Sequence, residues 1–456
     1  MTQEVMKPLK IGIAGVRGIV GETLTPELVI AFAQAFGTYL DSGKILICRD
    51  TRSSGPMVRA AVAAGLLASG CEVIDLGICP TPTMQLAVEH FQAAGGISIT
   101  AGHNPTQWNA LKFVRGDGLY LNTRQAEELL DIFHQGEFAK AGWNTIQTHI
   151  ESRDAIAHHI EVLKRVFDVE TIRARKLTVA VDCCNGACAL LSPRWLDELG
   201  CRVLAINDET NAPFPHNPEP KRETMAQLRA VVKAGHADIG FAHDADGERL
   251  AIVTETGEAL SEEMTLAIAA EIKLRQQPGV IVTHLSTSRS IETIAARHHS
   301  TVVRTPVGQA YISEAMLEHN AVLGGEGNGA VAIPAIHATN DSAATIGLIL
   351  EHLAKTGHNI SELVATLPRF TMLKHYVPVA PNLLFSVLNE IRAEAETAGA
   401  DDVDLSDGIK LSWLSWPDGW LHIRASNTES MIRLIAEAES EARANDLLDW
   451  AIDRLN

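Results

Sequence analysis

Residues Lys44–Leu76 read KILICRDTRSSGPMVRAAVAAGLLASGCEVIDL, and the order of apolar and polar segments within them decides the fold class of this chain. An apolar run that begins at Lys44 is followed by the polar turn Arg49–Arg52, by an amphipathic segment at Met57–Ser69, and by a second apolar run at Glu72–Leu76. A strand, a turn, a helix and a strand in this order predict a βαβ unit.

The same order of segments occurs twice more along the chain. One copy runs from Leu177 to Ile206 and another from Val280 to Arg304, and each has a helical segment between two apolar runs. Because such units build sheets with helices packed against them, three copies at wide spacing predict three similar α/β domains with mixed sheets.

The C-terminal part of the chain has a different pattern. Strand-like runs at Gly408–Leu414, Trp420–Arg424 and Ile432–Glu437 precede a helical segment at Ala442–Leu455, which predicts a smaller α+β domain. Turn-forming stretches between the units suggest where one domain ends and the next begins. We expect four domains, at residues 1–150, 151–255, 256–368 and 369–456.

Length, charge and motifs restrict the class of protein. A chain of 456 residues is too long for one hydrophobic core. Its formal net charge of −18 disfavours a nucleic-acid partner, which would need a basic stripe. The chain has no long apolar run and no apolar signal core, so we expect a cytoplasmic protein without a membrane span. No Gly-x-Gly-x-x-Gly segment opens a helix, which argues against a dinucleotide-binding enzyme.

A short acidic loop is the first candidate for chemistry. Asp244, Asp246 and Glu248 alternate between the apolar runs Ile239–Ala242 and Leu250–Thr254. Alternation can bring the three carboxylates to one concave side, where their mutual repulsion calls for a cation. Oxygen ligands suit a hard ion, and Mg²⁺ is the first choice. The alternative is a solvated acidic turn.

Two further polar clusters are suited to an anionic sugar. In Gly324–Gly329 the glycines allow close approach of a ligand, while Glu326 and Asn328 can bind sugar hydroxyls. In Arg424–Ser430, with Arg433 just beyond, a guanidinium, hydroxyls and turn-exposed N–H groups are typical of a phosphate site. A plain glycine turn and a polar turn between strands are the respective alternatives.

Residues Ile97–Phe113, ISITAGHNPTQWNALKF, resemble the active-site loop of the α-D-phosphohexomutases. The acidic loop resembles the metal loop of that family, Asp-x-Asp-x-Asp-Arg, with Glu248 in the third place. The other resembling segments, which follow the family's order, are the N-terminal Ile11–Gly18, the loop Thr305–Gly308, the sugar-binding loop Gly324–Gly329 and the phosphate loop Arg424–Ser430.

The resemblance implies four domains around a central cleft, each of which contributes a loop. It implies an isomerase that interconverts a hexose or hexosamine 1-phosphate and 6-phosphate through a hexose 1,6-bisphosphate, with Mg²⁺ as cofactor. The implied catalytic residues are Arg17, Gly102, His103 and Lys112, and the implied metal ligands are Asp244, Asp246 and Glu248. The implied substrate-binding residues are Arg249, Thr305, Gly308, Glu326, Asn328, Arg424, Ser426, Asn427, Thr428 and Arg433. For Lys112 a purely structural role is the alternative.

Gly102 departs from the family at the position of the serine that carries the phosphoryl group. Glycine has no side chain that could do so, and three hypotheses follow. The chain is a mutase whose phosphoryl group is carried by His103, Thr100, Ser98 or an entering bisphosphate primer. Alternatively, serine has been replaced by glycine, naturally or by engineering, in a competent scaffold. In the third hypothesis the protein binds phosphosugars, or transfers a phosphoryl group, without being a mutase.

Overall fold

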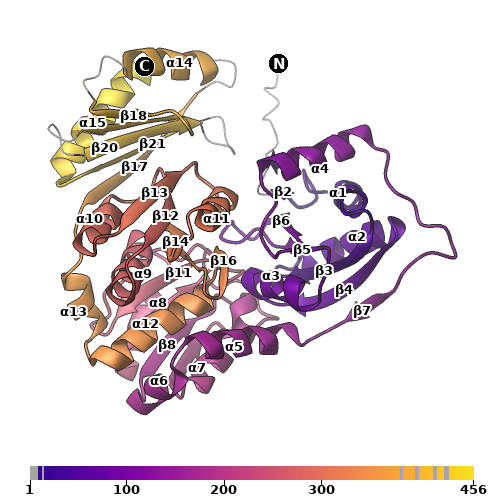
Figure 1. Cartoon of the computed structure of the whole chain (residues 1–456), viewed down its shortest axis with the longest axis horizontal. Helices are drawn as coiled ribbons and strands as arrows, with labels where there is room; N and C mark the ends of the chain where they lie inside the picture. Colours follow the sequence, from indigo (N-terminus) through magenta and orange to yellow (C-terminus); the bar gives the residue numbers. More distant parts are fainter. Residues whose placement is uncertain are drawn as a thin grey trace.

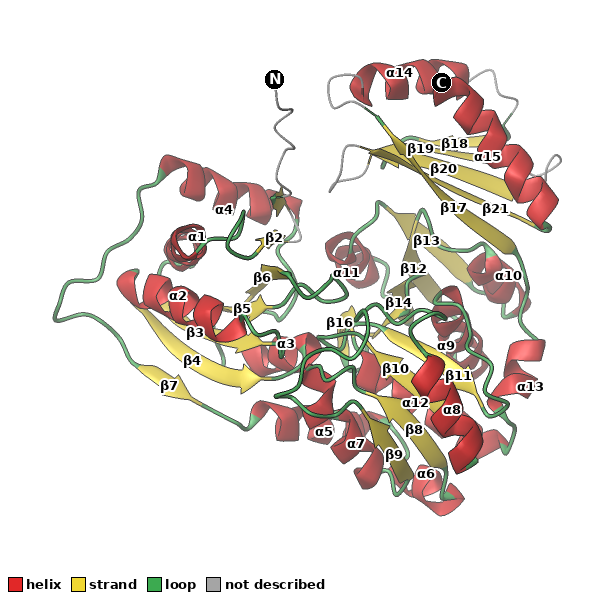
Figure 2. Ribbon diagram, turned by 180° about the vertical axis from the view of Figure 1, so that it is seen from behind, coloured by secondary structure: helices red, strands yellow, loops and turns green. Residues whose placement is uncertain are grey.

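The computed structural model describes residues 9–12, 15–379, 384–395, 400–413, 419–425 and 431–455. The candidate phosphate-loop residues Ser426, Asn427 and Thr428 lie outside the described residues. Four sheets follow one another along the chain, and the first three are packed with helices on both sides (Figure 1; Figure 2). None of the described helices is long and apolar enough to cross a bilayer.

The first domain contains a mixed seven-stranded sheet with the order β1-β2-β6-β5-β3-β4-β7. Its strands are β1 Lys10–Gly12, β2 Gly15–Ile19, β3 Gly43–Arg49, β4 Cys71–Ile78, β5 Gly95–Ile99, β6 Trp108–Arg115 and β7 His149–Glu151. Its helices are α1 Pro26–Tyr39, α2 Gly55–Ala68, α3 Thr81–His90 and α4 Thr123–Gln135. The strands β3, β4, β5 and β7 pair in parallel, whereas β1, β2 and β6 pair antiparallel.

Successive side chains of a strand point to opposite faces of its sheet, so a strand that is buried on both faces contributes to two cores. Ile45 and Ile47 of β3 belong to the core beneath α1, α2 and α4, whereas Leu46 and Cys48 belong to the core on the side of α3. The strand β3 is therefore covered on both faces, which explains why its sequence is a continuous apolar run.

The second domain has a four-stranded sheet with the order β11-β10-β8-β9. Its strands are β8 Thr178–Asp182, β9 Arg202–Ile206, β10 Ile239–His243 and β11 Leu250–Thr254. Its helices are α5 Ala155–Val166, α6 Val169–Arg175, the 3₁₀ turn η1 Ala187–Leu190, α7 Ser192–Glu198 and α8 Ala226–Gly235.

The third domain has a five-stranded sheet with the order β13-β12-β14-β15-β16. Its strands are β12 Val280–His284, β13 Thr301–Thr305, β14 Leu323–Glu326, β15 Ala330–Ile333 and β16 His337–Asn340. Its helices are α9 Glu263–Gln276, α10 Ser290–Arg297, α11 Gln309–Glu318, α12 Ser342–Thr356 and α13 Ile360–Ala365.

The fourth domain is an antiparallel sheet with the order β17-β21-β20-β19-β18, and its helices pack on one side. Its strands are β17 Thr371–Pro378, β18 Asp402–Asp404, β19 Ile409–Trp413, β20 Gly419–Ala425 and β21 Met431–Ala438. Its helices are α14 Leu384–Ala395 and α15 Glu441–Leu455. The predicted fold class, three α/β domains and a smaller α+β domain, is confirmed.

One hydrophobic core is shared by the first three domains, whereas the fourth domain has a core of its own. One continuous core includes Met84 of the first domain, Trp195 of the second and Ile349 of the third, all fully buried. The fourth domain has a separate core, to which Leu411 and Leu434 belong. The three α/β domains are thus packed together as one body, and the fourth domain adjoins that body through its surface.

Candidate active site

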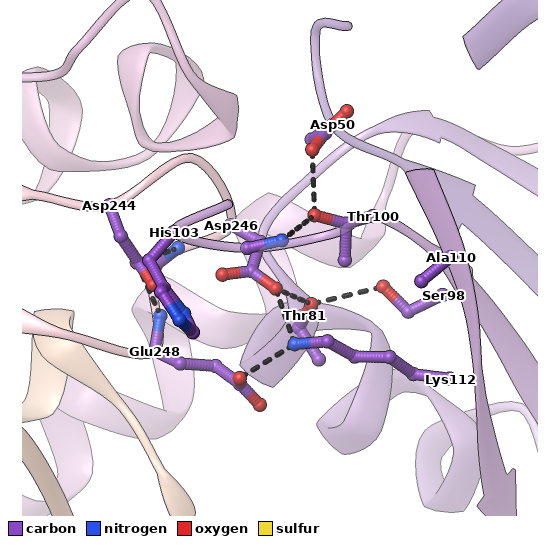
Figure 3. A network of polar contacts seen from close by, with 12 residues as sticks. Asp50, Thr81, Ser98, Thr100, His103, Ala110, Lys112, Asp244, Asp246 and Glu248 are labelled. Atoms are coloured by element: carbon purple, nitrogen blue, oxygen red, sulfur yellow. Dashed lines mark hydrogen bonds and ion pairs between the residues drawn. The ribbon is translucent and has the colours of Figure 1, made fainter. Parts of the chain in front are cut away.

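Two loops from different domains meet at the site, and Figure 3 shows Thr100 and His103 of one loop beside Asp244, Asp246 and Glu248 of the other. The loop that contains Gly102 follows β5, and the acidic loop follows β10. The backbone N–H of Thr81 donates to Asp246 O at 2.9 Å, and its Oγ1 donates to Asp246 Oδ2 at 3.1 Å. These bonds hold the acidic loop of the second domain against the start of α3 in the first.

A buried arginine fixes the loop that contains Gly102. Arg52 Nη2 donates to the carbonyl oxygens of Gly102 and Asn104, both at 2.7 Å, and its Nη1 donates to those of Pro105 and Trp108. Its Nε pairs with Asp50 Oδ2 at 2.9 Å. The planar fork of a guanidinium suits this arrangement of carbonyls. The sequence placed this arginine in a polar turn, but its role depends on contacts about fifty positions away.

Gly102 itself faces the acidic loop. Its φ of +53° lies in the left-handed region, and its N–H donates to Thr100 Oγ1 at 2.9 Å. A Cβ at this position would lie 3.3 Å from Asp246 Oδ1. That carboxylate oxygen is buried and has no hydrogen-bond partner among the described residues. A side chain at position 102 would therefore point directly at Asp246.

The acidic loop is closed by its first carboxylate. Asp244 Oδ1 accepts from the N–H groups of Gly247, Glu248 and Arg249 at 3.0, 3.1 and 3.2 Å. Burial, together with the charge of Asp246, raises the pKa of Asp244. Burial opposes the ionisation of Asp246 too, but Lys112 beside it brings its pKa below the ordinary value. The loop thus holds an ionised carboxylate at Asp246.

Lys112 lies between the acidic side chains. Its Nζ donates to Asp246 Oδ2 at 2.6 Å and to Glu248 Oε2 at 2.7 Å. Although burial opposes the charge, these two carboxylates raise the pKa of Lys112, so the amine stays protonated. Tyr120 Oη donates to Glu248 Oε1 at 2.5 Å, a contact that the sequence analysis missed because Tyr120 belongs to no motif.

His103 lies among basic side chains, which include Arg249, Arg17, Lys112 and Lys221. Its Nε2 lies 3.4 Å from Arg249 Nη2, and burial, followed by the charges of Arg249 and Arg17, lowers its pKa well below the ordinary value. Arg17 donates to Asn104 Oδ1 at 2.5 Å, and Arg249 pairs with Glu219 at 3.1 Å. A neutral imidazole among cations is the environment expected of a site for an anionic ligand.

The glycine loop of the third domain adjoins the acidic loop. Leu250 N–H donates to Gly329 O at 2.9 Å, which joins the two loops directly. Asn328 Nδ2 donates to Glu326 Oε2 at 3.1 Å, and His284 Nε2 lies 3.7 Å from Glu326 Oε1. The two candidate sugar-binding side chains therefore point at each other beside the acidic loop.

The candidates Thr305, Gly308 and Arg424 lie where the third and fourth domains meet. Asp407 Oδ2 accepts from Val307 N–H at 3.0 Å and lies 3.3 Å from Arg424 Nη2. Val307 lies between the candidates Thr305 and Gly308, and Gly308 has a φ of +143°. Thr305 is buried, and its hydroxyl bonds to the next carbonyl.

Two guanidiniums lie side by side on the sheet of the fourth domain. Arg424 on β20 is directly opposite Arg433 on β21. The Arg433 guanidinium lies 5.8 Å from the centre of the Tyr376 ring. Burial lowers the pKa of Arg424, and the carboxylates of Asp407 and Glu326 oppose this shift.

The donor set of the acidic loop fits an oxygen-preferring divalent cation. Two buried aspartates lie in one loop, and Asp246 Oδ1 is an unpartnered acceptor that a cation would satisfy. Among the described residues no three His, Cys, Asp or Glu side chains already stand at metal-binding geometry. Asp244 and Asp246 would hold Mg²⁺, and Lys112 pairs with Asp246 and with Glu248.

Comparison with known proteins defines the class. Family profiles described as phosphoglucomutase/phosphomannomutase domains match in order: alpha/beta/alpha domain I at residues 8–140, domain II at 157–257, domain III at 261–370 and the C-terminal domain at 379–453. The chain therefore belongs to the phosphoglucomutase/phosphomannomutase family, as its motifs predicted, and is a phosphohexomutase-type isomerase.

Individual relatives agree with this assignment. The chain is 38% identical to a phosphoglucomutase/phosphomannomutase of Thermococcus kodakarensis, over 97% of this chain and 98% of that one. It is 35% identical to a probable phosphoglucosamine mutase of Methanopyrus kandleri, over 97% and 96%. The crystal structure of a family protein from Burkholderia thailandensis superposes with a TM-score of 0.84 at 27% identity and covers 97% and 96% of the two chains.

Proposed function

We propose that the protein interconverts the 1-phosphate and 6-phosphate of a hexose or hexosamine, with Mg²⁺ bound and through a bisphosphorylated sugar. The observation that carries this proposal is the meeting of Arg17, Lys112 and Arg249 with the acidic loop opposite Gly102. Such a site combines cations that balance a phosphoryl group with carboxylates that hold a metal.

Each loop has a distinct task in this proposal. Mg²⁺, held by Asp244 and Asp246, would offset negative charge on the transferring phosphoryl group. Glu326 and Asn328 accept from and donate to sugar hydroxyls. Arg424 and Arg433, with Ser426, Asn427 and Thr428, bind the phosphate that does not react. Binding energy at that distant phosphate positions the reacting end.

The proposed reaction needs a group other than residue 102 to carry the phosphoryl group. Ser98 is buried and bonded to Thr81 Oγ1 at 3.0 Å, and Thr100 is buried and bonded to Asp50 at 2.6 Å. Neither hydroxyl is free to attack a phosphorus atom. His103 is neutral, and its Nε2 lies among cations that would stabilise a phosphoryl group. The two remaining carriers are His103 and a free hexose 1,6-bisphosphate.

The test is an assay with a hexose 1-phosphate, Mg²⁺ and a catalytic amount of hexose 1,6-bisphosphate, in which formation of the 6-phosphate is followed for glucose, mannose and glucosamine. Turnover supports the mutase. The intact mass after incubation with bisphosphate reveals any phosphoenzyme, and loss of the adduct in His103→Ala assigns it to that residue.

The second candidate function is a protein that binds phosphosugars, or transfers a phosphoryl group, without isomerising the sugar. Gly102 favours it, because the usual carrier is missing. Binding of the bisphosphate in a titration, with no 6-phosphate formed from any of the sugars, would support this alternative and contradict the mutase.

A further inference from the structure

Glu248 differs from its two acidic neighbours because side chains of the protein donate to both of its carboxylate oxygens. Its Oε2 accepts from Lys112 Nζ at 2.7 Å and its Oε1 accepts from Tyr120 Oη at 2.5 Å. When the amide of Gln309 is oriented to satisfy its neighbours, its nitrogen also donates to Glu248 Oε1 at 3.1 Å. Both carboxylate oxygens are therefore engaged by side chains of the protein.

The donors come from two other domains. Lys112 and Tyr120 belong to the first domain, and Gln309 begins α11 in the third. Glu248 is thus a junction that links all three α/β domains at the site. Asp246 has the opposite character, since its Oδ1 is buried, faces Gly102 and is without a hydrogen-bond partner among the described residues.

The length of the side chain accounts for this difference. The family pattern noted in the sequence has aspartate where this chain has glutamate, which is one methylene longer. The longer side chain spans the distance from the loop to the hydroxyl of Tyr120, whose ring lies 5.9 Å from Lys112 Nζ. To turn towards a metal, Glu248 would have to leave a buried hydroxyl and half of the charge pairing of Lys112 unsatisfied.

We infer that Glu248 is a positioning residue for Lys112 and not a ligand of the metal. The Tyr120–Glu248–Lys112 chain holds the ammonium group 2.6 Å from Asp246, beside the place where a side chain of residue 102 would be. Asp244 and Asp246 are then the carboxylates that bind the cation. The inference rests on the proposed function in one respect, that Mg²⁺ binds at this loop.

Binding of Mn²⁺, followed by electron paramagnetic resonance, tests the assignment without an activity assay. Mn²⁺ accepts the same oxygen ligands as Mg²⁺. We expect Asp246→Asn to weaken Mn²⁺ binding by at least about tenfold and Glu248→Gln to change it by less than about threefold. Equal weakening in the two variants would overturn the inference and leave the proposed function intact. No effect of Asp246→Asn would overturn both, because no ion would then bind at this loop.

A double-mutant cycle tests the chain of contacts. Tyr120→Phe removes only the hydroxyl that donates to Glu248. Glu248→Gln removes the negative charge of the carboxylate that accepts this hydrogen bond. Because the two act as one unit, the double variant should have the Tm of the less stable single variant. Tyr39→Phe, combined with Glu248→Gln, is the matched control. The Tm changes of these two substitutions should add in the double variant. Full additivity of Tyr120→Phe and Glu248→Gln would contradict the linkage.

Discussion

At the scale of single residues, Gly102 has no side chain that could carry a phosphoryl group, yet hydrogen bonds fix the loop around it. The N–H bond to Thr100 and the carbonyl bond to Arg52 hold residue 102 at a φ of +53°. A side chain is strained there by about 1–2 kcal/mol, but its Cβ would point at the free oxygen of Asp246. A side chain at residue 102 would therefore face the acidic loop, as a phosphoryl carrier in the proposed mutase would have to.

Restoring the hydroxyl is the corresponding experiment. We expect Gly102→Ser to raise mutase turnover by at least about tenfold, because a nucleophilic oxygen then lies beside the acidic loop and Lys112. Gly102→Ala is the control, since it introduces the same backbone strain without the oxygen. Both variants should lose about 1–2 kcal/mol of unfolding free energy in urea. Equal turnover in the serine and alanine variants would contradict the prediction.

The residue scale also shows what a sequence can reveal about a site. The alternation of Asp244 and Asp246 predicts them as candidates, whereas Lys112 is predicted by the resemblance of its loop to the active-site loop of the α-D-phosphohexomutases. Tyr120 and Gln309 were not predicted, because each reaches Glu248 only after the chain has folded. Tyr120 is separated from Glu248 by 128 positions, and no local pattern encodes such a contact.

At the scale of loops, Arg52 acts as the scaffold of the Gly102 loop. Lysine at this position keeps the charge but loses the planar fork that bonds to four carbonyls. We expect Arg52→Lys to lower the unfolding free energy by about 3 kcal/mol and turnover by at least about tenfold. Arg124→Lys, at an exposed pair with Glu128, should change stability by less than about 0.5 kcal/mol. An effect of Arg52→Lys no larger than this control would contradict the assigned role.

At the scale of helices, the N-terminus of α12 joins the three α/β domains. Asp341 accepts from Ala343 and Ala344 N–H at 2.9 and 3.1 Å, and its Oδ2 bonds to His159 Nε2 at 2.8 Å. The other nitrogen of His159 bonds to Thr83 Oγ1 at 2.8 Å. A helix cap of the third domain is thereby tied to α5 and α3.

Removing this carboxylate should cost more than a helix cap alone. We expect Asp341→Ala to lower the unfolding free energy by about 2–4 kcal/mol, because it removes the cap and leaves Nε2 of the buried His159 without a partner. Asn122→Ala, which removes the cap of α4 at the molecular surface, should cost about 1 kcal/mol. Urea unfolding followed by circular dichroism measures both, and equal losses would contradict the linking role.

Helices and strands differed in how well the sequence predicted them. The βαβ units were predicted because long apolar runs alternate with an amphipathic helix, and β3, β8 and β12 occupy those runs. The short strands β1 and β18 have three residues each, and their extended form depends on pairing with a neighbour and not on a local pattern. Tertiary contacts of this kind leave no periodic signal.

At the scale of the whole molecule, the fourth domain has its own core and is attached by a small set of polar contacts. Lys410 Nζ donates to Leu285 O at 2.7 Å, and His422 Nδ1 lies 2.8 Å from Ser286 Oγ. Asp407 adds the bond to Val307 N–H. The order of the domains could be read from the motifs, but this junction could not, because it joins residues more than a hundred positions apart.

Lys410 makes the stability of this junction depend on pH. Burial, followed by the charge of Arg304, lowers its pKa to about 7, whereas in the unfolded chain the pKa is about 10.4. Between these values the unfolded chain binds a proton that the native protein does not. The contribution of Lys410 to the unfolding free energy therefore rises with pH from about 7 to about 10.4, by at most about 1.4 kcal/mol per unit.

Replacement of this lysine should remove that slope. We expect the unfolding free energy of Lys410→Met, measured in urea by tryptophan fluorescence from pH 7 to 10, to rise less steeply with pH than that of the wild type. Trp420, whose ring lies 4.6 Å from the amine, reports on the same junction. Relative to the wild type, the unfolding free energy of the variant should be highest near pH 7, where the buried amine still favours unfolding. It should be lowest near pH 10. Parallel curves would mean that Lys410 keeps its proton in the native protein, and that the charge of the amine is balanced at the junction by Glu292, Glu437 or Asp404.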